Sequence, residues 1–445
     1  MKKTIENFFK LKSLNTNIKT EIIAGITTFM TMAYIIFVNP AMISQTGIDF
    51  GSAMMATCIA AAVSTIFMGL YANYPIALAP GMGENAFFTF TVCLTMGISW
   101  QTALGCVFIE GVIFIILTLT KLREKLIDAI PESLRHAIAC GIGLLIAFVG
   151  LIDAGLIIKH PSTLVTLGDI FSPATILALL GLIITSILLI KNIKGAILWG
   201  ILIAAILGIT LGIIKYTGLI STPPSMEPTF MKMDIIGALN FGLLSIIFVF
   251  LFMDIFDTVG TLAGVSELGG FMKNGKLPRA GRAMMADAVG TCVGAACGTP
   301  TVTSFIESAS GISAGGRSGL ASVITGIMFM LSLFFSPLVK MIGGVYQTNS
   351  GIILHPVTAS ILIIVGSMMC QSVIKIDWKD YSESIPSFLV IILMPLTFSI
   401  ATAIAFGFIS FAALKLFTSQ GKKVSWLVYL LAGLFILRFL YLKAL

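Results

Sequence analysis

Long apolar stretches recur along the chain and are separated by charged residues, Pro and Gly clusters. Most are about 20 residues long, the length that an α-helix needs to cross a bilayer. Seven precede a polar segment at 214–238, near 20–38, 51–70, 81–97, 101–120, 134–153, 173–190 and 194–213. Eight follow it, near 239–265, 284–298, 302–315, 317–338, 353–372, 385–398, 400–417 and 425–441. The pattern predicts an all-α polytopic membrane protein with about 14 spans.

Some of these stretches do not look like ordinary spans. Four are too short, or too rich in Gly and polar residues: 81–97, 284–298, 302–315 and 385–398. The last stretch, 425–441, is predicted either as a fifteenth span or as a helix lying at the membrane interface.

Composition supports this class of protein. Of the 445 residues, 57% are hydrophobic and 11% are charged, with a mean hydropathy of +1.04. An ordinary soluble domain has about 25% charged residues, so a soluble enzyme is excluded. The seven cysteines all lie in apolar segments without a C-x-x-C pair, so neither a disulfide framework nor structural zinc is expected.

The net charge of +7 does not indicate a nucleic-acid partner. The positions of the basic residues along the chain are what is informative. With the N-terminus in the cytoplasm, most of the 27 basic residues lie on the predicted inner side of the membrane. That asymmetry satisfies the positive-inside rule for a protein of the cell membrane.

The two halves of the chain share a pattern. In each half the third segment is short and opens with small residues and Pro, as APGMGEN (79–85) and GTPTVTS (298–304). An odd number of spans per half inverts the second half relative to the first. Interrupted segments at matching positions are the best sequence indicator of a transporter's binding site.

The predicted organisation has five parts. They are a cytoplasmic segment (1–19), a first repeat (20–213), an extracellular linker (214–238), a second repeat (239–418) and a C-terminal helix (419–445).

Ionisable groups inside a membrane are costly, so each needs a reason. The acids within the predicted spans are Glu84, Glu110, Asp153, Asp254, Asp257, Asp287 and Glu307. Asp153 and Asp287 fall near predicted span ends, where we expect water to solvate them. Glu110 is expected to hydrogen-bond between helices rather than to bind a ligand.

Asp254, Asp257, Thr258 and Thr261 form one polar stripe, because residues three and four apart share a helix face. Two carboxylates this close do not both ionise cheaply in a low dielectric. Two interpretations follow: a buried polar network that joins two bundles, or a site that binds and releases a proton.

The two interrupted segments complete the predicted site. A half-helix that starts after Pro300 would direct unpaired N–H groups at the midplane, with Glu307 within two turns. The mirror element starting at Pro80 carries Glu84 and Asn85 in its first turn. Such a pocket suits a small planar solute that has both hydrogen-bond donors and acceptors.

Several segments resemble one known family in order and spacing. They are TEIIAGITTF (20–29), Ala33-Tyr34, Asn39-Pro40, APGMGENAFF (79–88), DIFDTVG (254–260) and TVTSFIESASGISAGGR (301–317). The chain resembles the nucleobase–ascorbate (NCS2) transporter superfamily, in its AzgA-like branch of adenine, guanine and hypoxanthine permeases.

The resemblance implies a fold of seven plus seven spans in inverted repeats. Spans 1–4 and 8–11 would form a core domain, and spans 5–7 and 12–14 a gate domain. The third and tenth spans would each be a short β-strand followed by a half-helix.

The resemblance also implies roles for individual residues. Asp257 matches a carboxylate that hydrogen-bonds the base, with Asp254 a close alternative, and Glu307 matches the second such carboxylate. Asn85 matches a purine-contacting residue. The family implies proton symport without another cofactor, and often a homodimer joined through the gate domains.

Other side chains near these groups join the predicted base site. Thr303 and Ser304 precede Glu307 in the second interrupted segment. Phe87 and Phe305 would stack on the base, or else serve packing. Asp254, Asp257 and Glu307 are the predicted proton-coupling groups.

Two rival functions are considered. An anion transporter or channel of the sulfate-transporter type would keep the architecture, but the carboxylates disfavour an anion. An intramembrane aspartyl protease would need a Gly-x-Gly-Asp context, which the chain lacks, and its acids on two helices. The sequence has no phosphate-binding loop, so it gives no sign of ATP hydrolysis.

Overall fold

The computed structural model describes residues 2–120, 131–272, 277–344, 346–347, 353–418, 421 and 424–441. The segments 121–130 and 273–276, which carry several basic residues of the predicted inner side, lie outside the described residues.

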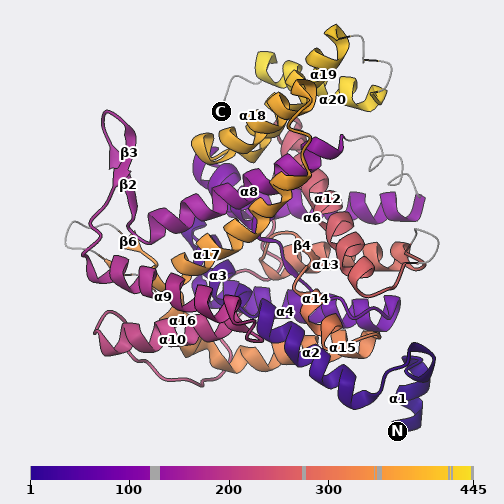
Figure 1. Cartoon of the computed structure of the whole chain (residues 1–445), viewed down its shortest axis with the longest axis vertical. Coiled ribbons are helices and arrows are strands. Elements are labelled where there is room, and N and C mark those ends of the chain that lie inside the picture. Colours follow the sequence, from indigo (N-terminus) through magenta and orange to yellow (C-terminus); the bar gives the residue numbers. More distant parts are fainter. Residues whose placement is uncertain are drawn as a thin grey trace.

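The first half of the chain is mostly helical (Figure 1). Its helices are α1 (Lys2–Phe8), α2 (Ile18–Met32), α3 (Ile35–Ile43), α4 (Phe50–Phe67), α5 (Met82–Ala86), α6 (Trp100–Thr120), α8 (Glu132–Asp153), α9 (Pro173–Ile190) and α10 (Ala196–Thr210). π-Helical turns extend α4 over Met68–Ala72 and α5 over Phe87–Thr95. The strands are β1 (Leu78–Pro80), β2 (Ile157–His160) and β3 (Leu164–Leu167).

The second half has the same character. Its helices are α11 (Ile235–Ala238), α12 (Leu244–Leu268), α13 (Ala280–Cys297), α14 (Ser308–Ser313), α15 (Gly319–Ser332), α16 (Ser336–Ile342), α17 (Pro356–Met369), α18 (Tyr381–Thr397), α19 (Ile400–Phe417) and α20 (Trp426–Tyr441). The strands are β4 (Val302–Ser304), β5 (Tyr346–Gln347) and β6 (Ile353–Leu354).

Within the described residues, nine helices are long and apolar enough to cross a membrane. Their ends follow local capping chemistry. The Asp49 side chain accepts a hydrogen bond from the Ser52 N–H at the start of α4, and Ser399 accepts from Thr402 at the start of α19. Such caps satisfy N–H groups that have no partner within the helix.

Two of the unusual stretches are parts of continuous helices. The stretch 284–298 belongs to α13, which begins at Ala280, and 385–398 belongs to α18, which begins at Tyr381. Neither helix is among the nine candidate spans. The stretches 81–97 and 302–315 are interrupted as predicted.

Helices that are far apart in the sequence pack against one another. α8 packs against α17 and α18, while α2 and α4 pack against α15, and α13 packs against α4 and α6. Small residues allow close approach: a Cβ on Gly143 of α8 would collide with the backbone carbonyl of Gly366 in α17. Small residues at helix contacts are typical of membrane bundles.

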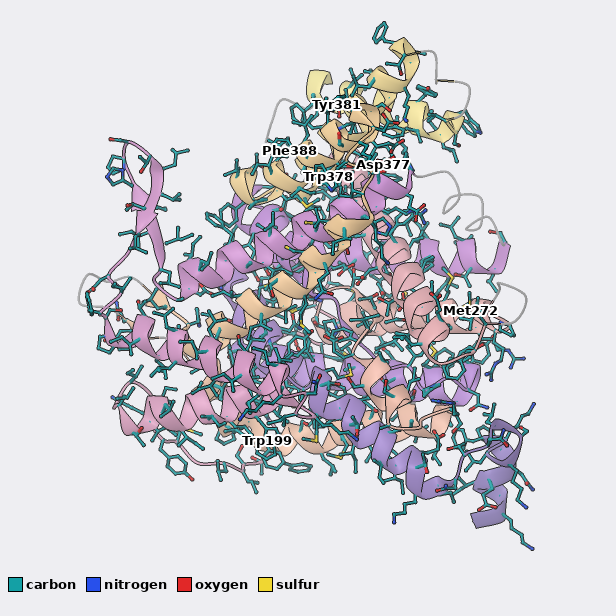
Figure 2. All side chains as sticks on the ribbon, in the orientation of Figure 1. Trp199, Met272, Asp377, Trp378, Tyr381 and Phe388 are labelled. Carbon is teal, nitrogen blue, oxygen red and sulfur yellow. The ribbon has the colours of Figure 1, made fainter. Side chains whose placement is uncertain are left out.

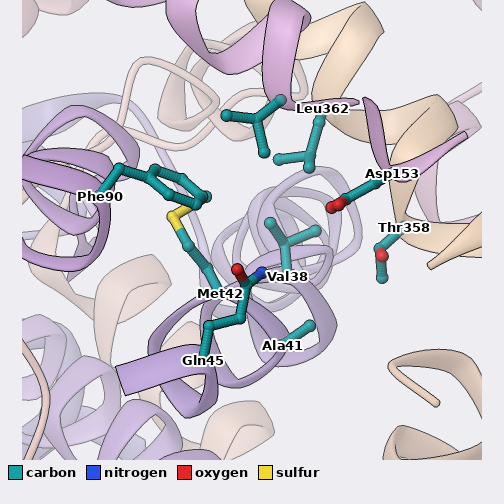
Figure 3. A pocket seen from close by; sticks show the side chains of 9 residues that line it. Val38, Ala41, Met42, Gln45, Phe90, Asp153, Thr358 and Leu362 are labelled. Atoms are coloured by element: carbon teal, nitrogen blue, oxygen red, sulfur yellow. The ribbon is translucent and has the colours of Figure 1, made fainter. Parts of the chain in front are cut away.

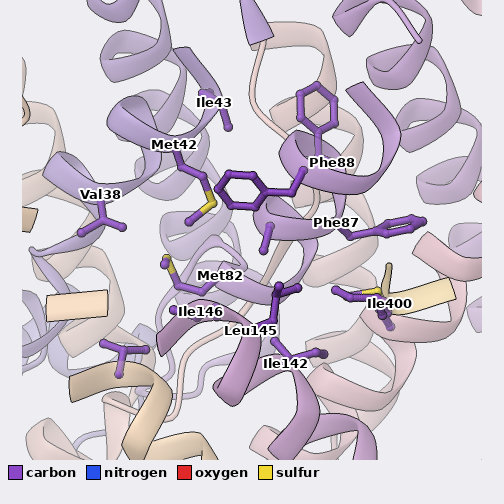
Figure 4. Close-up of a cluster of buried hydrophobic side chains, with 14 of the residues drawn as sticks. Val38, Met42, Ile43, Met82, Phe87, Phe88, Ile142, Leu145, Ile146 and Ile400 are labelled. Atoms are coloured by element: carbon purple, nitrogen blue, oxygen red, sulfur yellow. The ribbon is translucent and has the colours of Figure 1, made fainter. Parts of the chain in front are cut away.

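The interior and the periphery differ in their side chains. Phe87, Phe88 and Leu145 lie in a large buried apolar cluster between α3, α5 and α8 (Figure 4). Trp199 and Phe388 lie at the outside of the molecule (Figure 2) and are exposed. An apolar exterior of this kind suits contact with lipid.

Two further elements were not predicted. α1 precedes the first span, and the β2–β3 hairpin projects from the molecule between α8 and α9 (Figure 1).

Candidate functional site

The two interrupted segments meet through their strands. β1 and β4 pair antiparallel, with Leu78 opposite Ser304 and Pro80 opposite Val302. The pairing continues at both ends, since the Gly81 N–H donates to the Thr301 carbonyl at 3.0 Å and the Phe305 N–H to the Ala77 carbonyl at 2.9 Å. This ladder satisfies buried backbone groups that would otherwise be costly at this depth.

The first interrupted segment follows its prediction. Helix α5 begins at Met82 after Gly81, so Glu84 and Asn85 lie in its opening turns. The Glu84 carboxylate turns back toward Gly81, where a Cβ would collide with it. Gly81 therefore provides the space that this buried acid occupies.

The second segment has the short strand followed by a helix that the resemblance implies, but the helix starts later than the residue pattern predicts. No helix starts directly after Pro300, because residues 302–304 pair with β1 instead. Helix α14 begins at Ser308, and Glu307 is the residue immediately before it rather than a residue two turns inside. Ser308 fixes this arrangement by accepting a hydrogen bond from the Ala77 N–H at 3.0 Å.

Glu307 has a specific partner that the sequence prediction missed. The Tyr34 hydroxyl, between α2 and α3, donates to Glu307 Oε1 at 2.7 Å. Tyr34 belongs to one of the family-like motifs, which was the available signal, but spacing alone gave it no role. The hydrogen bond holds one carboxylate oxygen and leaves the other for a second donor.

Asp257 and Glu307 come together. The two carboxyl groups interact electrostatically, and Asp257 also lies beside Thr303. Asp257 is exposed and Glu307 is partly exposed, although both lie within apolar stretches of the sequence. We call Asp257 and Glu307 the open pair.

The predicted polar stripe on α12 divides into two faces. Asp254, Thr258 and Thr261 are buried, whereas Asp257 is exposed. Asp254 Oδ2 accepts a hydrogen bond from Thr291 of α13 at 3.2 Å, and its other neighbour is Glu110 of α6. We call Glu110 and Asp254 the sealed pair, since both are fully buried.

Asp287 is not solvated at a helix end, so that prediction is wrong. It is fully buried in the middle of α13, where Thr258 donates to Oδ2 and Ser304 donates to Oδ1 at 3.3 Å. The error arose because α13 starts four residues before its predicted start. Thr258 also hydrogen-bonds Thr303 at 2.9 Å, so α12, α13 and β4 are joined.

Asn85 is the clearest unsatisfied group. Its side chain is fully buried, and neither the amide oxygen nor the amide nitrogen has a hydrogen-bond partner. An unpaired buried amide costs free energy, so a ligand with both a donor and an acceptor would be stabilised by pairing with it.

The aromatic residues separate into two roles. Phe87 is fully buried and packs edge to face with Phe250 at a centroid distance of 4.8 Å. This position favours the packing role for Phe87. The Phe305 ring lies 6.5 Å from that of Tyr34, which places it next to the open pair.

A narrow cavity lies on another side of the interrupted helix (Figure 3). Its volume is about 10 Å³, and its lining includes Met42, Gln45, Phe90, Asp153 and Leu362. Asp153 ends α8, as predicted, and is half-buried. The cavity holds no more than about one water molecule, so no solute passes here in this conformation.

No cation pairs with the acids of the site within the described residues. Among the residues that the structure describes, ion pairs join Glu132 to His136, and Asp380 and Glu383 to Lys415, and none reaches an acid of the open or sealed pair. In the same part of the chain, no three His, Cys, Asp or Glu side chains are arranged to hold a metal ion.

Known proteins share this fold. The transmembrane domain of a cyanobacterial bicarbonate transporter, BicA, aligns with a TM-score of 0.65 over 87% of this chain and 97% of that chain, at 15% identity. The fold of that transporter has seven plus seven spans in an inverted repeat, and this chain has the same fold.

Sequence comparison identifies the family. The guanine/hypoxanthine permease PbuG of Bacillus subtilis is 45% identical over 99% of this chain and 100% of its own length. The adenine permease AdeP of Escherichia coli is 41% identical over 99% and 97%. Residues 19–406 match the model of a permease family. The chain is therefore a multi-pass membrane permease that belongs to this family, the nucleobase–ascorbate (NCS2) transporters.

Proposed function

We propose that this permease imports purine nucleobases across the cytoplasmic membrane by proton symport. The observation that carries the proposal is the open pair: two interacting carboxyl groups, one exposed and one partly exposed, without an ion-pair partner in the described residues. The names of its relatives, adenine permease and guanine/hypoxanthine permease, supply the substrate class.

A neutral purine matches the hydrogen-bonding groups of the site. Its ring and exocyclic N–H groups donate to Asp257 and to the Glu307 oxygen that Tyr34 does not hold. Its ring nitrogens accept from the Asn85 amide, which lacks a partner. Phe305 supplies an aromatic face beside these groups. Together these contacts satisfy the groups that the empty site leaves unpaired.

The same groups disfavour the anion alternative. Bicarbonate or sulfate would meet carboxylates without a compensating Lys or Arg, which raises the free energy of binding. The similarity to BicA concerns the fold, and a fold does not determine the solute.

Proton coupling follows from the surplus of buried acids. A proton on one carboxyl turns a repelling pair into a donor and an acceptor, and raises affinity for the base. By linkage, the bound base then raises affinity for the proton by the same factor.

The wider organisation is part of this proposal. The N-terminus lies in the cytoplasm, and spans 1–4 and 8–11 move as a core against a gate of spans 5–7 and 12–14. Gate domains of two copies join in a homodimer. The narrow cavity at Asp153 lies where α3 faces α8 and α17, and so fits the closed side of such a cycle.

Uptake of labelled hypoxanthine tests the proposal in cells that lack their own purine permeases. We expect Asp257→Asn and Glu307→Gln each to abolish uptake while surface expression is unchanged. Asp377→Asn, the same type of change at an exposed loop position, serves as the matched control and retains uptake. Normal uptake by both site variants would refute the proposed site.

The coupling ion and the solute are tested in the same cells. Uptake falls when a protonophore collapses the proton gradient and is unchanged when sodium is replaced by choline. Unlabelled adenine, guanine and hypoxanthine compete, whereas bicarbonate and sulfate do not. A strict sodium requirement, or competition by the anions alone, would contradict the proposal.

A further inference from the structure

The sealed pair consists of two acids that lack adequate hydrogen-bond donors. Glu110 and Asp254 are both fully buried, and their side chains interact across the contact between α6 and α12. Among the residues that the structure describes, none donates a hydrogen bond of normal geometry to either oxygen of Glu110 or to Oδ1 of Asp254. Two ionised carboxylates in this position would repel each other with several lone pairs unsatisfied.

The neighbouring titratable groups do not relieve this repulsion. The acids Asp287 of α13 and Glu84 of α5 face the pair, and the Cys292 thiol of α13 lies beside it. In the part of the chain that the structure describes, no Lys, Arg or His forms an ion pair with any of these groups. A proton taken up by one of the two acids would relieve the repulsion.

The sealed pair and Asp287 differ in the hydrogen-bond donors that surround them. Asp287 accepts from Thr258 and Ser304, so both of its carboxyl oxygens have a donor. In the part of the chain that the structure describes, Glu110 has only the buried Thr301 hydroxyl as a nearby donor, and that hydroxyl has no other partner. The pair is thus an acceptor site with an unused hydroxyl directed at it.

We propose that Glu110 and Asp254 together bind the proton that accompanies the solute, at a site separate from the open pair. The ligand is a single proton shared between two carboxyl oxygens, which satisfies two of the unpaired atoms at once. This inference rests on the proposed function and assigns Glu110, which the sequence suggested only as a structural contact, to ion binding.

Thr291 connects this site to the open pair. Its hydroxyl has one hydrogen but two acceptors within reach, Asp254 Oδ2 at 3.2 Å and the Val302 carbonyl at 3.0 Å. An ionised Asp254 attracts that hydrogen, whereas a protonated Asp254 leaves it on Val302. The Val302 N–H also donates to the same hydroxyl at 3.2 Å, so the position of β4 depends on the state of Asp254.

Strand β4 transmits the change to the solute. Thr303 follows Val302 and lies beside Asp257, and the chain continues through Phe305 to Glu307. In each cycle one O–H bond forms when the sealed pair takes a proton from one solution, and the same bond breaks when the proton leaves to the other. No other bond changes.

Reconstituted full-length protein tests the inference with two measurements. Counterflow exchanges internal unlabelled hypoxanthine for external labelled hypoxanthine and requires no net proton movement. Accumulation driven by an imposed pH gradient does require it. We expect Glu110→Gln to retain counterflow and to lose at least tenfold in gradient-driven accumulation.

Matched variants separate the possible causes. Thr118→Val is a control on the same helix as Glu110, since it removes a buried hydroxyl that has no partner among the described residues. It is expected to leave both measurements unchanged. Asp257→Asn is expected to lose both measurements. Thr291→Val preserves the sealed pair but removes its link to β4, so it should reduce accumulation more than counterflow.

Infrared difference spectroscopy gives a readout that a structural role would not produce. The C=O band of a protonated carboxyl, sensitive to deuterium exchange, is expected in the wild type and is lost in Glu110→Gln. Full accumulation by Glu110→Gln, or an unchanged band, would overturn the inference. If the wild type shows no purine counterflow, the proposed function itself fails. If Glu110→Gln does not fold, Thr291→Val takes its place in the comparison of counterflow with accumulation.

Discussion

The open pair and the sealed pair contain the same functional group in opposite surroundings. Asp257 and Asp254 lie one helical turn apart on α12, yet Asp257 is exposed and Asp254 is fully buried. Glu307 accepts from the Tyr34 hydroxyl, whereas Glu110 accepts no hydrogen bond of normal geometry from the described residues. The comparison shows that the function of a carboxyl group depends on its surroundings rather than on its residue type. The accessible pair suits a solute, and the inaccessible pair suits a proton.

The largest effect is expected on the affinity for hypoxanthine, which should fall in a variant of the open pair but not in one of the sealed pair. Asp257→Asn should weaken hypoxanthine binding by about 100-fold, because a hydrogen bond to a charged group is worth about 1.5–3 kcal/mol. Glu110→Gln should change the same affinity by less than about threefold, the range expected for a group that does not contact the solute. Calorimetric titration in detergent measures both. Equal losses in the two variants would remove the distinction between the pairs.

A smaller effect is expected at Asn85. Asn85→Leu has a similar volume and removes an amide without a partner. The variant should bind hypoxanthine about tenfold more weakly and, without ligand, should be more stable by about 1 kcal/mol, since the unpaired amide costs free energy in the empty protein. Thermal unfolding with and without hypoxanthine checks both signs. A lower stability of the empty variant would show that Asn85 is satisfied by another group.

Tyr34 should have a still smaller influence on the open pair. Tyr34→Phe removes the donor to Glu307 Oε1 and leaves the ring in place. Binding should weaken by about fivefold, which corresponds to a net hydrogen bond of about 1 kcal/mol. Phe305→Leu, which removes the neighbouring ring, provides a comparison. Unchanged binding in Tyr34→Phe would mean that Glu307 does not contact the solute.

The fold could be predicted from the sequence to a large extent, and the site only in part. Apolar periodicity located the spans, and Pro80 and Pro300 marked the interrupted segments, because both signals act along the chain. The Thr258–Asp287 hydrogen bond and the contact of Glu110 with Asp254 join different helices. Helix spacing orders residues on one face but does not determine which neighbouring helix that face meets. Asp287 is an example. The predicted span began at residue 284 and so placed Asp287 near a helix end, whereas α13 begins at Ala280 and Asp287 lies in its middle.

The smallest effect on transport is expected far from both pairs, at Asp380. Its side chain caps α18, and the hydrogen bonds from Ser382 hold the pKa of the Asp380 carboxyl below its ordinary value. Asp380→Ala should lower stability by about 1 kcal/mol at pH 7 and leave hypoxanthine affinity unchanged.

The pH dependence of this difference follows from the lowered pKa. A carboxyl with a lowered pKa in the folded state stabilises the protein above its ordinary pKa of about 4, and this contribution is lost as the pH falls through the folded pKa. The difference in melting temperature between Asp380→Ala and the wild type should therefore shrink below about pH 4. A constant difference would show that the cap acts without its charge.

The central claim is that a neutral base and a proton cross together because separate carboxyl pairs bind them. The most direct measurement records labelled hypoxanthine and internal pH at the same time in sodium-free proteoliposomes that contain the wild-type protein. An inward hypoxanthine gradient is predicted to acidify the interior as the base enters, and Glu110→Gln is predicted to abolish the acidification. Uptake of hypoxanthine by the wild type at constant internal pH would contradict the account.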